Sequence, residues 1–269
     1  MEWPDEVKGL LEAFPGEVSL AVEVLPEGGG PGARLSHRAE EAYPAASLIK
    51  LPVLLAALEA AERGELPLEQ EVAVGGEATG GAGVVEHFHP GTRLTLGDLL
   101  LCMTAVSDNA ATNHVLDLVG FEAVNALSSR LGLKDTLLRR RMMDAAARAA
   151  GRENTTTAAD MHRLLRQLVR PELVSPRVAA HARRLLALQQ LKLGFGTFLP
   201  EERVAHKTGD LAGLFHDAGL VDPEGPVTVV YAFLSRGVEN LGEASVAAGR
   251  VGQAVAAWAA SLAGEGRGR

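Results

Sequence analysis

The sequence predicts an α+β (mixed α/β) fold in which helices flank an antiparallel sheet that is joined to an all-helical subdomain. Three observations predict this class. Valine-rich, alternating segments, which are typical of strands, lie near the two ends of the chain. Helical patterns dominate the long middle part. The late strand-like segments follow one another after short turns, which favours antiparallel pairing.

The first predicted elements are a helix and a hairpin. An amphipathic pattern ends near Pro15 and Gly16, and alternating valine-rich residues follow. Glycines then mark a turn before a second alternating segment. In order, we expect a helix over residues 4–14, a strand over 17–24, a turn over 27–32 and a strand over 33–38.

The middle of the chain reads as helical. An apolar run that continues to Ala61 predicts a helix beginning near Ser47, and Asp108 is placed to cap a later helix. Residues 63–95 are rich in glycine and are expected to be mostly loop. Further helices are predicted over 96–105, 109–119, 121–131, 155–168 and 176–191.

The last part of the chain returns to strand character before an alanine-rich helix. Strands are predicted over 203–208, 214–221 and 227–234, and the helix over 243–263. The early hairpin has to pair with these late strands. We therefore expect a discontinuous sheet subdomain, residues 1–42 and 192–269, around an all-helical subdomain, residues 43–191.

Composition limits the function classes. The 269-residue chain is 47% hydrophobic and has a formal net charge of −8, which disfavours a nucleic-acid or anionic-membrane partner. Its one cysteine, Cys102, excludes an internal disulfide. The first residues lack a signal-peptide pattern, so we expect a cytoplasmic protein, or a periplasmic or secreted one if a leader was removed. We expect a monomer.

Three short motifs carry the chemistry. Ser47 and Lys50 are one helical turn apart and would share a face. A serine hydroxyl is a poor nucleophile, but a nearby amine that burial keeps neutral can accept its proton. Each motif alone is compatible with an ordinary helix start or strand edge, whereas their joint occurrence in order indicates acyl transfer. The motifs are Ser47-Leu48-Ile49-Lys50, Ser107-Asp108-Asn109 and Lys207-Thr208-Gly209.

With these motifs, 60 and 100 residues apart, the sequence resembles the class A serine β-lactamases of the β-lactamase and penicillin-binding protein superfamily. Residues 91–96 and 155–160 extend the resemblance over most of the chain. The resemblance implies a serine β-lactamase/transpeptidase-like fold with its site in the crevice between the two subdomains. It implies no metal and no organic cofactor.

The resemblance also implies a role for each motif residue. Ser47 matches the nucleophile and Lys50 its partner amine, while Ser107 matches the hydroxyl that passes a proton to the leaving group. The backbone N–H groups of Ser47 and Asp210 match the oxyanion hole. The remaining matched residues hold the substrate or the amines: Asn109, Lys207, Thr208 and Gly209.

The sequence departs from the family pattern in three places. The glutamate that activates the deacylating water, with its asparagine four residues on, is missing where it should fall, at Arg141 to Met143. Asp144 and Glu153 are the nearest candidate bases. Asp210 follows the third motif, where a small or hydroxyl residue is usual. No arginine stands where the family usually places one to pair with a drug's carboxylate; the matching strand begins Pro226-Val227-Thr228.

These features predict a serine acyl-hydrolase, acylated at Ser47, that hydrolyses β-lactams slowly or acts on related amides and esters. Its expected partner is therefore a small-molecule β-lactam, amide or ester. Two alternatives remain open: an esterase or D,D-peptidase-like hydrolase with incidental β-lactam reactivity, and a penicillin-binding or sensing protein that stays acylated. His87 and His89 have no third metal ligand nearby in the sequence, so no metal site is expected.

Overall fold

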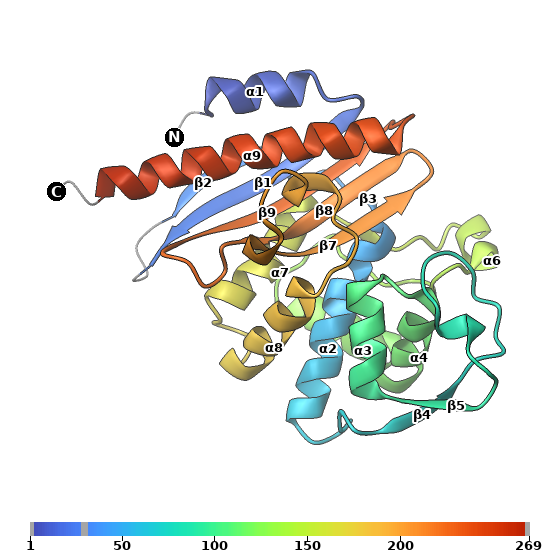
Figure 1. The fold of residues 1–269 in the computed structure, drawn as a ribbon. Coiled ribbons are helices and arrows are strands. Elements are labelled where there is room, and N and C mark those ends of the chain that lie inside the picture. The colour runs from blue at the N-terminus through green and yellow to red at the C-terminus, as the bar shows by residue number, and fades with distance from the viewer. Residues whose placement is uncertain (1–2, 28–31, 267–269) are drawn as a thin grey trace.

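A five-stranded antiparallel sheet organises the computed structural model, which describes residues 3–27 and 32–266 (Figure 1). Every neighbouring pair is antiparallel and the strand order is β2-β1-β9-β8-β7. The predicted α+β class and the pairing of the early hairpin with the late strands are confirmed. Most of the predicted turn over 27–32 lies outside the described residues. The strands are β1 (Glu17–Pro26), β2 (Ala33–His37), β7 (Val204–Leu211), β8 (Leu214–Val221) and β9 (Val227–Arg236).

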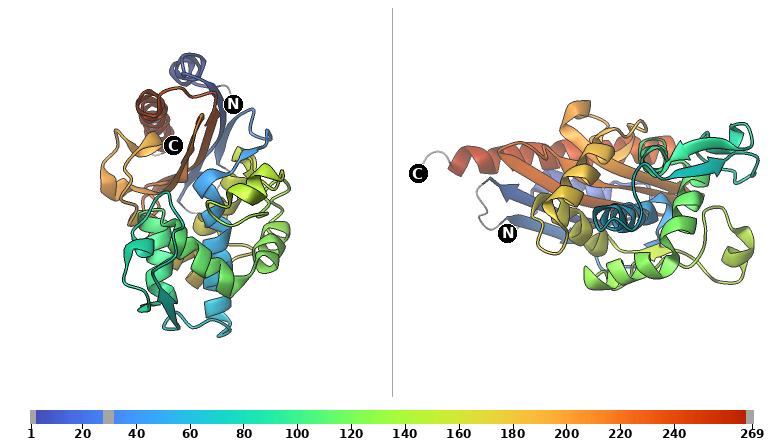
Figure 2. Two further views of the ribbon diagram at one scale, coloured as in Figure 1. Left: turned by 90° about the vertical axis from the view of Figure 1, so that its right-hand side faces the viewer. Right: turned by 90° about the horizontal axis from the view of Figure 1, so that it is seen from below.

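Helices cover both faces of this sheet. Helices α1 (Asp5–Glu12) and α9 (Leu241–Gly266) lie on one face, above the sheet in Figure 1. The other helices lie on the opposite face, and the turned views in Figure 2 show the same separation. Each face has its own apolar core, because alternate residues of the strands point to opposite sides.

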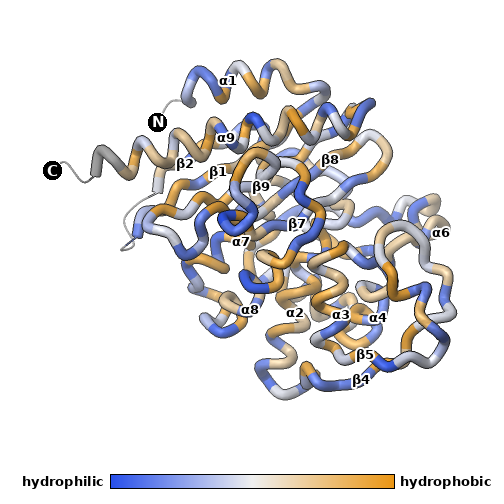
Figure 3. Tube along the Cα trace, viewed as in Figure 1, coloured by the Kyte–Doolittle hydropathy of each residue, from blue (hydrophilic) through white to orange (hydrophobic). Residues whose placement is uncertain are grey.

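Helix α2 (Lys50–Glu62) is the centre of the helical half. Its residues from Lys50 to Leu58 are all buried, and Figure 3 shows hydrophobic residues along α2 and the neighbouring α3. A helix that is apolar all round belongs in a core rather than on a surface. Around it pack α3 (Leu96–Ala105), α4 (Asn109–Val119), α5 (Phe121–Arg130) and α8 (Pro176–Ala187). Helix α7 (Ala158–Val169) packs against α8 and the sheet, and the short α6 (Ala145–Ala149) lies further out.

Several predicted elements differ in detail. The helix expected from Ser47 begins as a 3₁₀ turn, η1 (Ala46–Ile49), before α2. The helix expected to reach residue 191 ends at Ala187, because Gln189 and Gln190 instead bond to the backbone at the end of α3. The glycine-rich segment 63–95 contains a two-stranded ladder that we did not predict, β4 (Glu71–Val74) with β5 (Thr92–Thr95).

A second short ladder pairs β3 (Tyr43–Pro44) with β6 (Thr155–Thr156). The middle segment is therefore mainly rather than wholly helical. We retain as a proposal its division from the rest, with residues 43–191 as one subdomain and residues 1–42 and 192–269 as the other. None of the described helices combines the length and apolarity that crossing a membrane requires.

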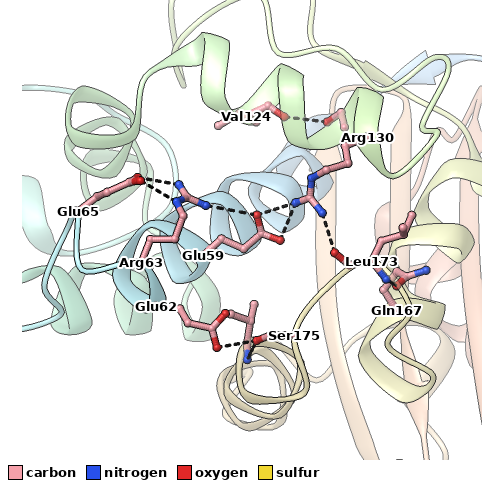
Figure 4. A network of polar contacts seen from close by, with 11 residues as sticks. Glu59, Glu62, Arg63, Glu65, Val124, Arg130, Gln167, Leu173 and Ser175 are labelled. Atoms are coloured by element: carbon pink, nitrogen blue, oxygen red, sulfur yellow. Dashed lines mark hydrogen bonds and ion pairs between the residues drawn. The ribbon is translucent and has the colours of Figure 1, made fainter.

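The far end of α2 is fixed by a polar network (Figure 4). Glu59 accepts two hydrogen bonds from Arg130 of α5, at 2.6 and 2.7 Å, and Arg130 also donates to the carbonyl oxygen of Leu173. Ser175, which caps α8, donates to Glu62. Exposed ion pairs are each worth only about 0–1 kcal/mol, so this network orients α5 and α8 on α2 more than it stabilises the fold.

We predict that a glycine-to-alanine substitution has opposite effects on stability in α1 and in α9. A Cβ on Gly252 of α9 would lie 1.9 Å from the carbonyl oxygen of Phe195, whereas a Cβ on Gly9 of α1 would meet nothing within 4 Å. Alanine is better than glycine inside a helix by about 1 kcal/mol. Gly9→Ala should therefore raise the free energy of unfolding by roughly 0.5–1 kcal/mol. Gly252→Ala should lower it by about 1–3 kcal/mol through overpacking.

Denaturant unfolding of the two variants beside the wild type measures both effects. Equal stabilisation by the two substitutions would show that α9 does not approach Phe195 this closely.

Candidate active site

A cleft of about 310 Å³ opens between the sheet and the helical half, and all three motifs meet at or beside it. Strand β7, the η1 turn, the start of α4 and the loop before α6 form its walls. The cleft is lined by Ala46, Ser47, Gly81, Ala82, Ser107, Asn109, Arg140, Met142, Met143, Asn154, Leu191, Asp210, Leu211, Ala212 and Leu241.

Two lysines converge on the hydroxyl of Ser107. Lys50 Nζ lies 3.1 Å from Ser107 Oγ and donates to the Ser107 carbonyl oxygen at 2.5 Å and to Asn109 Oδ1 at 2.8 Å. Lys207 Nζ lies 2.9 Å from the same Oγ and donates to the Thr208 carbonyl oxygen. The structure thus joins residues from three distant parts of the chain in one hydrogen-bonded group.

Burial changes the protonation of both amines. Both side chains are 1% exposed, and removal from water disfavours a charged ammonium group. Burial, reinforced by the positive charge of Lys207, holds the pKa of Lys50 well below its usual range. Burial also lowers the pKa of Lys207 to about 7, although the carboxylates of Asp210 and Asp217 oppose the shift. A neutral Lys50 has a lone pair and can accept a proton.

Strand β7 reaches the turn that carries Ser47 because of one glycine. A Cβ on Gly209 would lie 3.0 Å from the backbone nitrogen of Ser47 and 3.3 Å from that of Leu48. This contact places Asp210 beside the half-buried Ser47 at the cleft. The hydrogen bonds of Lys50 run to Ser107 and Asn109 rather than to Ser47.

Asp108, the middle residue of the second motif, holds a neighbouring loop against the site. Its carboxylate caps α4 through Ala111 N and also accepts from Val84 N at 2.6 Å and Val85 N at 2.9 Å. Asn109 extends the contact through its backbone and side chain to the carbonyl oxygens of Ala82 and Gly80. The capping of α4 by Asp108 was predicted, whereas the hydrogen bonds from Val84 and Val85 to Asp108 were not.

Two asparagines that sequence reasoning missed hold the loop before α6. Asn113 receives a hydrogen bond from Met142 N at 2.9 Å and donates to Met142 O at 3.2 Å. Asn154 accepts from the backbone nitrogens of Arg139 and Arg140 at 2.7 and 3.0 Å. Met142 is thereby fixed in the cleft wall, within the range where the resemblance placed the missing glutamate.

The two candidate deacylation bases lie outside the cleft lining. Asp144 caps α6 by accepting from Ala147 N at 2.8 Å. Glu153 pairs with Arg140 at 2.7 Å and with Arg148 at 3.3 Å. Among the described residues that line the cleft, Asp210 is the one carboxylate, and its side chain is exposed.

Backbone strain is concentrated at this cleft. Ala46, Ser107 and Met143 adopt φ values of +46°, +57° and +60°, which are unfavourable for residues with a Cβ. All three line the cleft. Strain of this kind costs about 1–3 kcal/mol per residue and is typical of functional sites that the surrounding structure holds in place.

The strand that the sequence resemblance matched to the family's arginine, which begins at Pro226, corresponds to β9, and β8 lies between β9 and β7. On β8, His216 lies opposite Gly209, and its Nε2 is 2.9 Å from the carbonyl oxygen of Pro44. Burial lowers the pKa of His216, so this ring does not replace a permanently charged arginine.

Comparison with known proteins agrees with this geometry. A family model described as the β-lactamase enzyme family matches residues 4–259. The chain belongs to this family. A β-lactamase from Sphaerobacter thermophilus, 30% identical, superposes with a TM-score of 0.84 over 95% of this chain and 96% of its own.

Two other proteins that resemble this chain are described in other terms. PBP-A is 25% identical, with a TM-score of 0.77 over 93% of this chain and 94% of its own. A similar structure is that of a PBP-A variant as an acyl-enzyme complex with penicillin G. The β-lactamase regulatory protein BlaB of Streptomyces cacaoi is 28% identical over 71% of this chain and 76% of its own length. The family therefore leaves hydrolase, penicillin-binding and regulatory functions open.

The described residues contain no group of three His, Cys, Asp or Glu side chains that could hold a metal ion. His87 and His89 lie in the loop that Asp108 holds, and both are exposed.

We predict that one buried lysine titrates near neutrality. In a sample with ¹³C-labelled lysine, one side-chain resonance should titrate at about pH 7, because burial lowers the pKa of Lys207. Lys207→Gln should remove that resonance. The resonance that disappears in Lys207→Gln belongs to Lys207. If that resonance titrates above pH 9 in the wild type, as an exposed lysine does, burial does not lower the pKa of Lys207.

Proposed function

We propose that this protein is a serine acyl-hydrolase that forms an acyl-enzyme at Ser47. The observation that carries the proposal is the Ser107 hydroxyl held between the amines of Lys50 and Lys207 beside the cleft that Ser47 lines. A nucleophile, a neutral amine and a hydroxyl able to relay a proton are the groups that acyl transfer needs.

In the proposed reaction, Ser47 Oγ attacks the substrate carbonyl carbon while its proton passes to the neutral amine of Lys50. Catalytic hydrogen bonds often tighten only when substrate binds, so the absence of a direct contact in the free protein is compatible with this step. The backbone N–H groups of Ser47 and Asp210 would stabilise the oxyanion. The bond to the leaving group then breaks as that group takes a proton from Ser107, which regains one from Lys50.

Removal of the acyl group should be the slow step. Met142, which lines the cleft and carries a thioether, lies in the loop where the resemblance expects a glutamate. A thioether cannot accept a proton from water, and Asp144 and Glu153 are engaged elsewhere. Deacylation should thus lack a positioned base, and the acyl-enzyme should persist.

A penicillin-binding or regulatory protein that stays acylated is the second candidate. The lack of a positioned deacylation base favours this candidate, because a β-lactam would then remain attached to Ser47. The similarity to BlaB and PBP-A supports this alternative. In both cases acylation occurs at Ser47, and the two differ in the lifetime of the product.

We predict that covalent labelling depends on Ser47. Ser47→Ala should abolish labelling by a fluorophosphonate and by a fluorescent penicillin. Lys50→Met should slow labelling about 100- to 10,000-fold, because it removes the general base at similar volume. Mass spectrometry of the intact protein and of its peptides measures both effects. Labelling that survives in Ser47→Ala, or that maps to another residue, would refute the assignment.

We predict a burst followed by slow turnover on penicillins. Met142→Glu should raise the deacylation rate at least about tenfold, since even an imperfectly placed general base contributes. Asp144→Asn should leave that rate unchanged, because Asp144 only caps α6. Time-resolved mass spectrometry of the acyl-enzyme gives both rates. Fast wild-type deacylation that is lost in Asp144→Asn would show that Asp144, not position 142, supplies the base.

A further inference from the structure

Large apolar side chains form an apolar wall in the cleft that Ser47 lines. Four large apolar side chains come from three separate segments: Met142 and Met143 from the loop before α6, Leu211 from the end of β7, and Leu241 from the start of α9. Met143 is 51% exposed and Leu241 43% exposed, so each presents apolar surface to the solvent at the cleft. Exposed leucine and methionine that converge on a reactive serine indicate a ligand surface.

Charge in the cleft is sparse. The guanidinium of Arg140, which is 9% exposed, is paired with Glu153 at 2.7 Å. Asp210 contributes an exposed carboxylate next to the β7 contact with Ser47. A substrate carboxylate close to Asp210 would be repelled, and more strongly in a dry cleft than in water.

The direction of β7 indicates which part of a substrate meets the apolar wall. Lys207 contacts Ser107, which is the proton donor for the leaving group in the proposed mechanism. Gly209 lies against Ser47, and Leu211 follows two residues later on the same strand. A strand rises about 3.3 Å per residue, so Leu211 lies roughly 13 Å along β7 from Lys207.

Leu241 lies at the same end of the cleft. The backbone of Val238 bonds to Gly213 O in the turn between β7 and β8, which brings the start of α9 to this turn. Moving along β7 from Lys207 past Ser47 therefore leads from the leaving group to the acyl group. The leucines meet the acyl side of the scissile bond.

We propose that the physiological substrate class is a neutral ester or amide with an unbranched apolar acyl chain, and that Met142, Met143, Leu211 and Leu241 hold this chain. The inference rests on the proposed acylation of Ser47 and names the substrate of that same site. An apolar chain gains by leaving water in this cleft, whereas a carboxylated β-lactam brings an anion toward Asp210.

The test compares acylation rates across p-nitrophenyl acetate, butyrate and octanoate, each kept below its aggregation limit. Burying one CH₂ is worth at most about a fourfold gain in kcat/KM, since the transfer term is about 0.8 kcal/mol. We expect kcat/KM to rise between about 10- and 1,000-fold from acetate to octanoate, because the chain is partly exposed.

Two variants and a matched control locate the effect. Leu241→Ser and Met143→Ser should each reduce the octanoate-to-acetate ratio at least about threefold, because each removes an apolar contact that only the longer chain can reach. Leu173→Ser is the control, because Leu173 is a leucine of similar exposure, 50%, near the far end of α2. The control should keep the wild-type ratio.

The outcomes separate this inference from the proposed function. A fluorophosphonate that labels Ser47, together with a flat chain-length profile, would overturn the inference and leave the acylation proposal standing. Failure of any reagent to label Ser47 would overturn the acylation proposal itself. Equal losses on acetate and octanoate in both cleft variants would show that their side chains do not touch the chain.

Discussion

The burial of two ammonium groups around one hydroxyl is the constraint on which the site depends. Lys50 and Lys207 both approach Ser107 Oγ to within 3.1 Å, and neither side chain is more than 1% exposed. Two full charges that close would repel each other strongly in a dry interior. Burial lowers the pKa of both amines, and the charge of Lys207 lowers that of Lys50 further, so removal from water favours the neutral form of Lys50.

Polar side chains on rigid elements hold the loops that complete the cleft. Asp108 binds the glycine-rich loop, and Asn113 and Asn154 bind the segment that ends at Met142. These groups satisfy backbone N–H and C=O groups that would otherwise be buried without partners. Asp108 caps α4 and Asn113 lies on it, while Asn154 adds its contacts from the segment before β6. These contacts explain how a strained backbone at Ser107 and Met143 can persist.

The fold is shared with proteins that are described differently, a β-lactamase and PBP-A. In this chain the cleft wall carries a thioether at Met142 and a carboxylate at Asp210. In the proposed function, the first residue bears on removal of the acyl group and the second on which substrates approach. Neither alters the five-stranded sheet or the packing of α2, so the same fold can support hydrolysis or long-lived acylation.

The sequence alone determined the class of fold, the order of most elements and the three motifs, because valine alternation, helical spacing and rare tripeptides are local signals. It missed the β4–β5 ladder, whose strands are short and lie in a glycine-rich segment. It left open the order of the strands in the sheet, since strand order is not a local property. Only the tertiary structure decided the protonation of Lys50, the position of Met142 and the engagement of Asp144 and Glu153 elsewhere. Those features follow from burial and from contacts between residues far apart in the chain.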